Sequence, residues 1–125
     1  MKRDSLKEIK KGLMGVTHPG HEAVASFDEP YLKKVKEFYI DYTLERKGAA
    51  LPRKVKEMII MSVCTAMARF GGTRLHLKRA LLAGATPREV LEALQTAAIP
   101  GGLPVLWNGA AILAEEMKKM KVTFR

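Results

Sequence analysis

Hydrophobic residues recur along this chain at intervals of three and four, which is the spacing of one face of an α-helix. No stretch alternates between apolar and polar residues with the period of two that is typical of a half-buried strand. The expected fold is therefore an all-α bundle of about six helices in a single domain. Periodicity and capping residues predict a short helix starting at Asp4 or Ser5, and longer helices over about 29–46, 52–67, 74–84, 87–98 and 105–120.

Local signals mark where several of these helices should begin and end. Asp28 is a candidate N-cap, and Gly48 is expected to provide a left-handed stop after the helix that follows. Thr86 and Glu89 have the spacing of a capping box, with a proline at the first helical position between them. The helix over 29–46 should bury an apolar stripe made of Leu32, Val35, Phe38 and Tyr39.

Glycine and proline are expected to interrupt the helices at three places. Pro19-Gly20 falls in a predicted loop, FGGT at 70–73 in a predicted tight connection, and IPGGLP at 99–104 in a predicted break before the last helix. The first loop carries His18 and His21. Their three-residue spacing can serve metal ligation on a helix, but they bracket a Pro-Gly turn and lack an Asp, Glu or Cys at ligand spacing. No metal site is therefore expected there.

Length and composition agree with one globular domain. The chain has 125 residues, of which 47% are hydrophobic and 28% charged, and this is enough to form a core of its own. No apolar run reaches the roughly 18 residues that span a bilayer, and the charged start of the chain does not resemble a secretory signal. Because Cys64 is the single cysteine, an intramolecular disulfide and a cysteine-based zinc cluster are excluded. We therefore expect a cytoplasmic protein without a membrane partner.

A formal net charge of +9 makes this a basic protein and raises the question of an anionic partner. Nucleic acid is the obvious candidate, but proteins that bind it usually gather their basic residues in one patch or stripe. Here lysine and arginine are spread over several predicted helices, without interleaved aromatic residues or a recognition motif. A solvated basic surface is the better interpretation, and nucleic-acid binding is not expected.

The strongest chemical signal lies in the predicted helical hairpin over 56–84, where Glu57 and His76 stand on successive helices. A carboxylate and an imidazole can face each other across such a hairpin, and burial with pairing then tunes the pKa of both groups, as in acid/base sites. The alternative is a structural ion pair that orients the two helices. The Glu57 helix is apolar on most sides, which predicts burial in the core or in an oligomer interface.

Three segments of the chain resemble the carboxymuconolactone decarboxylase family, which includes the alkylhydroperoxidase-D-like reductases. They are LPRKVKEMI at 51–59, HLKRALLAGATPREV at 76–90 and the Gly-x-Pro turn at 102–104. The resemblance implies an all-helical bundle that assembles with copies of itself as a homotrimer or homohexamer. It also implies that Glu57 and His76 match the acid/base pair with which decarboxylase members protonate a dienolate as carbon dioxide leaves a muconolactone.

The chain departs from this family at the positions of the family's thiols. Reductase members have Cys-x-x-Cys-x-x-x-His, and counting back from His76 places those cysteines at Arg69 and Gly72. A dithiol peroxidase mechanism is therefore not expected, and Arg69 would give the site a cation that the dithiol members lack. Pro100 stands where many members place an aromatic residue before the Gly-x-Pro turn, so the shape of the pocket is expected to differ.

Four further residues are candidates for the substrate pocket. Arg69 and Arg74 flank the predicted turn and can bind a substrate carboxylate, although both can also be plain surface arginines. Cys64 is either a small buried hydrophobe or a working thiol, activated by Arg69 or by the imidazole of His76. Trp107 is expected to pack, with a place in the pocket wall as the alternative.

These observations together predict an oligomeric all-α enzyme with acid/base chemistry on a small anionic organic acid or lactone. The expected reaction is a decarboxylation of the lyase type or an isomerisation, and no cofactor is expected. Two alternatives stay open. One is a non-catalytic oligomeric binding or scaffold protein, which the loss of both thiol positions favours. The other is single-thiol antioxidant activity through Cys64.

Overall fold

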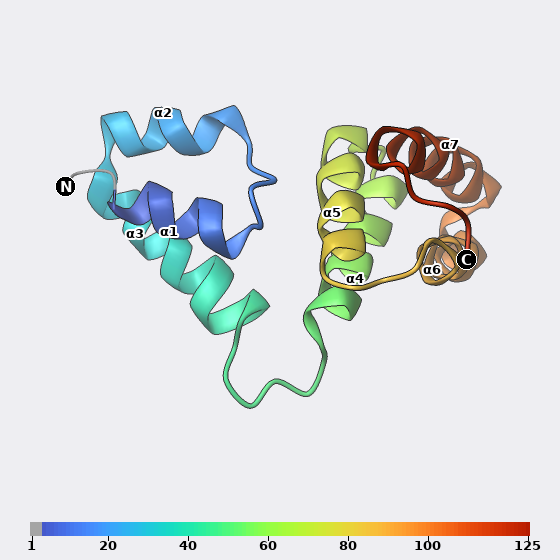
Figure 1. The fold of residues 1–125 in the computed structure, drawn as a ribbon, viewed down its shortest axis with the longest axis horizontal. Coiled ribbons are helices and arrows are strands. Elements are labelled where there is room, and N and C mark those ends of the chain that lie inside the picture. The colour runs from blue at the N-terminus through green and yellow to red at the C-terminus, as the bar shows by residue number, and fades with distance from the viewer. Residues whose placement is uncertain (1–3) are drawn as a thin grey trace. The chain divides into compact units, whose positions relative to one another are not determined.

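The structure, a computed structural model, describes residues 4–125, and every regular element in this range is a helix (Figure 1). This confirms the predicted all-α fold. None of these helices is long and apolar enough to cross a membrane. The elements are α1 (Asp4–Gly12), α2 (Pro19–Phe27), α3 (Glu29–Lys36), the π-helix η1 (Glu37–Leu44), α4 (Arg53–Ala66), α5 (Phe70–Leu82), α6 (Pro87–Gly101) and α7 (Leu103–Met120).

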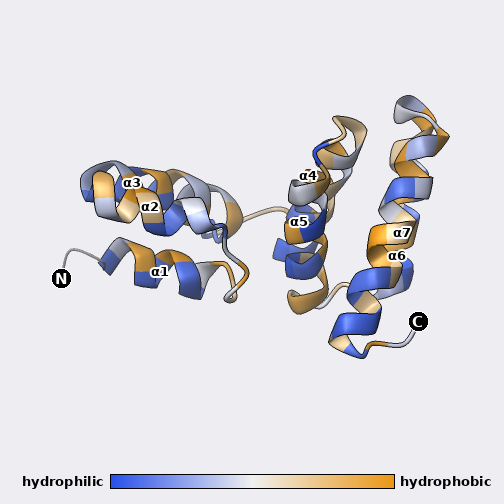
Figure 2. Ribbon diagram, turned by 90° about the horizontal axis from the view of Figure 1, so that it is seen from above, coloured by the Kyte–Doolittle hydropathy of each residue, from blue (hydrophilic) through white to orange (hydrophobic). Residues whose placement is uncertain are grey.

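Contacts within the chain divide it into two compact units, Met1–Leu51 and Pro52–Arg125. The first unit holds α1 to η1, and the second holds α4 to α7. Hydrophobic and hydrophilic residues alternate around the helices of both units, as Figure 2 shows, so each helix has an apolar side to bury. In the first unit, α1, α2 and α3 pack against one another. The buried apolar residues of this unit are Leu6, Ile9, Leu13, Ala25, Leu32, Ile40 and Leu44.

The helix predicted over 29–46 is present, but its second half is a π-helix. From Glu37 to Leu44 the backbone follows i→i+5 hydrogen bonding, which turns successive side chains through a smaller angle than an α-helix does. The prediction that Phe38 is buried is therefore wrong. Phe38 is 70% exposed, and Ile40 and Leu44 occupy the core instead. Of the remaining residues in the expected stripe, Leu32 is buried while Val35 and Tyr39 are half-buried.

The loop predicted around Pro19-Gly20 is also wrong, because α2 begins there. Pro19 occupies the first helical position, where a missing N–H removes no intrahelical hydrogen bond. His18 is the N-cap, and its Nδ1 accepts a hydrogen bond from the N–H of Gly20 at 2.9 Å. In return, Nδ1 of His21 accepts one from the N–H of His18 at 3.2 Å. The two histidines thus form a capping box at the start of α2.

Two other predicted helix signals are confirmed. Asp28 accepts a hydrogen bond from the N–H of Tyr31 at 3.2 Å and so caps α3. At the start of α6, the N–H of Glu89 donates to Thr86 Oγ1 at 3.1 Å, and the N–H of Thr86 donates to Glu89 Oε1 at 2.9 Å. Gly48 has the left-handed φ of +67° expected of a stop, but η1 already ends at Leu44 with Glu45 as its C-cap, so the prediction that Gly48 ends this helix is wrong.

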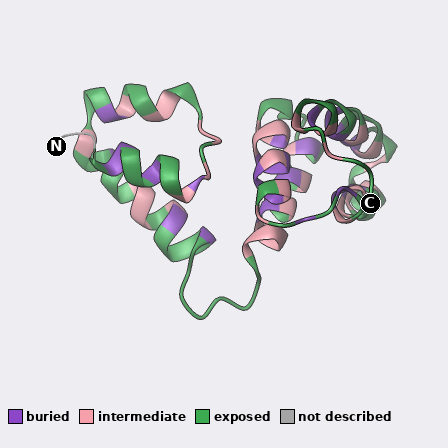
Figure 3. Cartoon of the chain, in the orientation of Figure 1, coloured by how far each residue is buried: buried purple, intermediate pink, exposed green. Residues whose placement is uncertain are grey.

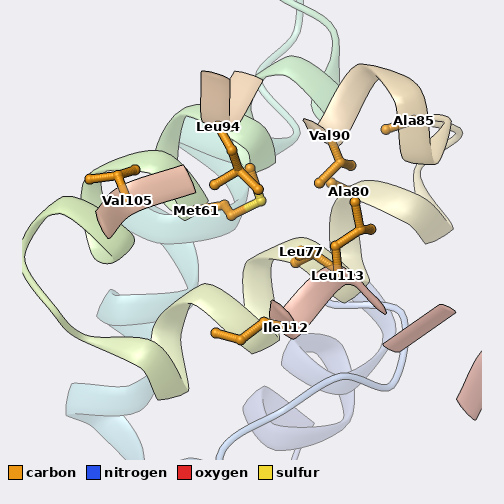
Figure 4. Close-up of a cluster of buried hydrophobic side chains, with 9 residues drawn as sticks. All are labelled: Met61, Leu77, Ala80, Ala85, Val90, Leu94, Val105, Ile112 and Leu113. Atoms are coloured by element: carbon orange, nitrogen blue, oxygen red, sulfur yellow. The ribbon is translucent and has the colours of Figure 1, made fainter. Parts of the chain in front are cut away.

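In the second unit, α4 packs along α5 and α6 packs along α7, and the two pairs enclose the main core (Figure 4). The buried residues lie on the sides of these helices that face one another, as Figure 3 shows. Near the turn between α4 and α5, the buried hydroxyl groups of Thr65 and Thr73 are hydrogen bonded at 2.9 Å. The core cluster consists of Met61, Leu77, Ala80, Ala85, Val90, Leu94, Val105, Ile112 and Leu113.

Two of the predicted breaks in this unit lie at other residues. α5 begins at Phe70, so both glycines of the predicted connection lie inside the helix. The turn precedes them, where Ala68 has a φ of +58°. α6 continues through Pro100, and Gly102, with a φ of +93°, separates it from α7. A residue that can adopt positive φ therefore decides where α6 ends, and the proline is accommodated in the last turn.

Candidate functional site

The structure brings Glu57 and His76 into direct contact between α4 and α5. The Nδ1 atom of His76 lies 2.7 Å from Oε1 of Glu57. Glu57 shares the buried face of α4 with Met61 and Thr65, because these positions recur every four residues. Glu57 is fully buried and His76 is 7% exposed, so the pair is shielded from bulk water while the imidazole keeps a small exposed edge.

A third side chain, that of Arg53, completes this site. Arg53 lies one turn before Glu57 on α4, and its Nε donates a hydrogen bond to Glu57 Oε2 at 2.7 Å. Its side chain is 13% exposed. Glu57 is therefore held through both of its oxygens, by His76 on one and by Arg53 on the other. Our sequence reasoning missed Arg53, although its four-residue spacing to Glu57 is a recognisable signal for an ion pair on a helix.

Burial and pairing act in opposite directions on the pKa of Glu57. Burial by itself raises the pKa of this carboxyl, whereas the hydrogen bonds and positive charges of His76 and Arg53 lower it. The partners outweigh the burial, and the pKa of Glu57 lies below its ordinary value. Glu57 is therefore an ionised carboxylate in neutral solution.

The charge on Glu57 determines which nitrogen of His76 can exchange protons. An ionised carboxylate only accepts hydrogen bonds, so the close contact requires a proton on Nδ1 of His76. Nε2 is then the nitrogen through which the ring takes up or releases a proton. In chemical terms the arrangement is an imidazole oriented by a fixed anion, which is able to act as a general base or a general acid.

Cys64 lies against the backbone of α5 at Gly72. A Cβ atom on Gly72 would lie 2.8 Å from the Sγ atom of Cys64, so a side chain at position 72 would have to displace the sulfur. Gly72 precedes His76 by one helical turn, or about 6 Å along the axis. The half-buried thiol thus lies beside one of the two positions at which the reductase members carry a cysteine, but it reaches that place from α4.

Arg74 connects α5 to α7. Its Nη1 donates to Glu116 Oε2 and its Nη2 to Glu115 Oε1, each at 2.6 Å. These two carboxylates raise the pKa of the guanidinium, and Glu116 is buried. The contact with α7 gives Arg74 a structural role, and the predicted binding of a substrate carboxylate by Arg74 stays a prediction.

The two other predicted pocket residues have exposed positions. Arg69 is the N-cap residue of α5 and is exposed. Trp107 lies in the second turn of α7 and is 61% exposed. Exposed positions of this kind are compatible with a pocket entrance or with an interface, and the predicted contacts of these two residues with a substrate stay predictions.

An apolar groove of about 370 Å³ lies between α4 and α6. Successive residues of an α-helix are rotated by about 100°, which places Ile59 on the opposite side of α4 from Glu57. The groove therefore does not open onto the Glu57 carboxylate. It is lined by Val55, Met58, Ile59, Ser62, Val63, Ala93, Thr96 and Ala97.

Comparison with known families identifies the family of this chain. The model of the carboxymuconolactone decarboxylase family matches residues 34–115, a range that contains Arg53, Glu57 and His76. The chain belongs to the carboxymuconolactone decarboxylase family. This confirms the resemblance found in the sequence, and it includes the part of the first unit from Lys34 onward. A search of the curated proteins finds no significant match.

The fold of this family member is also found in a solved structure. It is similar to the crystal structure of a proposed carboxymuconolactone decarboxylase from Burkholderia xenovorans LB400, with a TM-score of 0.78. The similarity covers 97% of each chain at 20% sequence identity. At this identity the likeness establishes the fold, and the chemistry has to be argued from the site itself.

Proposed function

We propose that this member of the family is a cofactor-free enzyme that transfers protons on a small anionic organic acid or lactone. Decarboxylation and isomerisation are the two reactions that we propose for this site. The observation that carries the proposal is the contact between the buried, ionised Glu57 and the imidazole of His76, which keeps an exposed edge. A net charge of +9 favours the approach of an anionic substrate.

In a decarboxylation, the bond between the substrate carbon and its carboxylate breaks, and carbon dioxide leaves. The electron pair of that bond passes into the conjugated lactone as a dienolate. The imidazolium of His76 then donates its Nε2 proton to carbon and regains one from water. One proton is consumed for each carbon dioxide released, which balances the charge of the lost carboxylate. Glu57 remains an anion throughout and orients the ring.

An isomerisation uses His76 first as a base and then as an acid, again with Glu57 as the anion that orients the ring. Neutral His76 takes a proton from the carbon next to the carbonyl and returns it to another carbon of the conjugated system. In both reactions the ring alternates between its neutral and charged forms, which requires that it neither holds its proton too tightly nor loses it too easily.

The first test of this proposal is turnover by the full-length chain. We expect carboxymuconolactone to be consumed with release of one carbon dioxide, and the product formed in deuterium oxide to carry solvent deuterium on carbon. Muconolactone without the extra carboxyl group is the matched control, since it can exchange or isomerise but cannot lose carbon dioxide. If the carboxylated lactone binds and is recovered unchanged and without deuterium, the protein is a binding protein and the catalytic proposal is wrong.

We also propose that the protein assembles with copies of itself, as a homotrimer or homohexamer. Ile59 and Val63 of α4 and Met67, its C-cap residue, are spaced four residues apart, and each is about half exposed, at 49%, 53% and 54%. Ile99 and Trp107 add further exposed apolar surface to the same unit, at 86% and 61%. A row of exposed apolar side chains on one helix is typical of an interaction surface.

A charge placed in this row should prevent the assembly. We expect Val63→Glu to be monomeric where the wild type is a trimer or hexamer, because a carboxylate would have to be buried without a partner. Light scattering coupled to size-exclusion chromatography measures the mass. Ala114→Glu is the control, since it adds the same charge to an exposed position of α7 beside Glu115. A monomeric wild type, or the same mass for Val63→Glu and wild type, would contradict the proposal.

A further inference from the structure

Arg53, Glu57 and His76 form a continuous chain of hydrogen-bonded charged groups in the second unit. Both contacts to the carboxylate are 2.7 Å long. The exposed fractions of the three side chains are 13% for Arg53, 0% for Glu57 and 9% for His76. At this degree of burial the guanidinium affects the carboxylate and the imidazole much more strongly than a surface charge does.

A buried carboxylate that had His76 as its only partner would hold a proton on the imidazole very firmly. The pair of an anion and an imidazolium is neutral, whereas loss of the proton leaves an uncompensated negative charge in the interior, which is costly. A positive charge on the other oxygen removes this penalty, because it neutralises the anion when the imidazole is neutral. The ring can then both take up and release its proton.

We propose that Arg53 is a positioning residue of this site. By binding Oε2 it turns the Glu57 carboxylate toward His76, and its charge keeps the pair from holding its proton too tightly for transfer. The inference rests on the proposed function, since a ring that exchanges its proton is what the reaction needs. It is nevertheless a statement about proton binding in the free protein, so it can be tested without a substrate.

Arg79, three residues after His76 on α5, is a further buried cation of this unit. Several other charged groups of the packed helices have nearer partners of their own. On α4, Lys54 pairs with Glu89 of α6 at 3.1 Å. Arg74 of α5 pairs with the two acidic residues of α7, Glu115 and Glu116, and Lys78 and Lys119 are within 4.0 Å and 3.5 Å of Glu116. The charges that act on the Glu57 carboxylate are those of His76 and Arg53.

The test is a pH titration of the His76 ring by NMR in the full chain, labelled in its histidines. The chain has three histidines, and the signal of His76 is identified by its loss in His76→Asn. In Arg53→Gln we expect the midpoint of proton uptake by the Glu57–His76 pair to rise by about one pH unit or more, because a nearby positive charge is lost. In the wild type, the ring nitrogen shifts should place the neutral ring's proton on Nδ1.

Arg53→Lys is the conservative variant and retains the charge at the same place. We expect its midpoint to stay close to that of the wild type, which separates the effect of charge from that of packing. Lys118→Gln removes a positive charge from an exposed position of α7 and should leave the midpoint unchanged. If Arg53→Gln does not fold, Arg53→Lys still tests the inference. A midpoint of proton uptake that rises by about one pH unit or more in Arg53→Lys would overturn it.

The inference is also overturned if the midpoint in folded Arg53→Gln is unchanged or lower, or if Lys118→Gln moves it as far as Arg53→Gln does. These outcomes are distinct from failure of the proposed function. A protein that turns over no lactone but shows the rise in Arg53→Gln has the proton-binding site inferred here without the proposed reaction. A protein that turns over the lactone but shows no rise has the reaction without this role for Arg53.

Discussion

His76→Asn is expected to lower kcat/KM for the turned-over lactone by about 10²- to 10⁴-fold, the usual contribution of one general acid or base. An asparagine amide can still donate a hydrogen bond to Glu57 Oε1, so the carboxylate keeps a partner. The amide cannot gain or lose a proton near neutral pH, so transfer to and from carbon is lost. Because the change affects the transition state and not the bound substrate, the loss should appear in kcat with KM little altered.

His18→Asn is the matched control for this variant. His18 is the N-cap of α2, and asparagine is among the best residues at that position. The same substitution in the other unit should therefore leave both the fold and kcat/KM unchanged. Steady-state rates of carbon dioxide release measure both variants. A His76→Asn protein with the wild-type rate, or equal losses in the two variants, would show that His76 does not transfer the proton.

Glu57→Gln is expected to destabilise the fold by about 3 kcal/mol or more at neutral pH, because removing one partner from a buried ion pair is far more costly than the net value of the pair. The amide has the size of the carboxyl group, so packing is retained. Arg53 and His76, however, lose the anion that they share. Urea unfolding followed by circular dichroism measures the free energy of unfolding.

Glu115→Gln is the control for this prediction. It removes a carboxylate that also lies 2.6 Å from an arginine but is 57% exposed, and exposed pairs contribute about 0–1 kcal/mol. Similar losses in the two variants would mean that the burial of Glu57 has no energetic consequence. A Glu57→Gln protein as stable as the wild type would mean that the contact exists for function and not for the fold.

The cost of Glu57→Gln should also depend on pH. Folding lowers the pKa of Glu57, so its contribution is fully present above the unfolded value of about 4.3. The contribution is lost as the pH falls through the lower pKa of the folded state. The difference in unfolding free energy between wild type and Glu57→Gln should therefore shrink steadily as the pH falls below about 4.3. A difference that stays constant, or that grows, would contradict the lowered pKa.

Where local chemistry decides a structure, most of the predictions from sequence are correct. The capping box of Thr86 and Glu89 and the N-cap at Asp28 are confirmed, because caps depend on residues a few positions apart. The contact between Glu57 and His76 was also predicted from the sequence, because two amphipathic helices joined by a short turn pack with their apolar faces together. The same local reasoning failed at Pro19, which begins a helix as readily as it ends one.

Where contacts between helices decide, the sequence was not sufficient. The exposure of Phe38 follows from a π-helix that the apolar spacing does not reveal. Gly72 lies inside α5, where a side chain would come too close to the sulfur of Cys64 on α4. Arg53 has a visible spacing to Glu57, but many surface pairs share that spacing, and only burial turns it into a strong interaction.

The sequence by itself therefore determined the helical class, the family and the two residues, Glu57 and His76, that meet in the candidate site. These depend on periodicity, on caps and on motif spacing, all of which are properties of the chain read in order. Only the tertiary structure decided the state of that site. It shows that Glu57 is fully buried and held through both oxygens, so that it is a fixed anion in contact with the imidazole of His76. Burial and partners set a pKa, and both exist only once α4 and α5 have packed together.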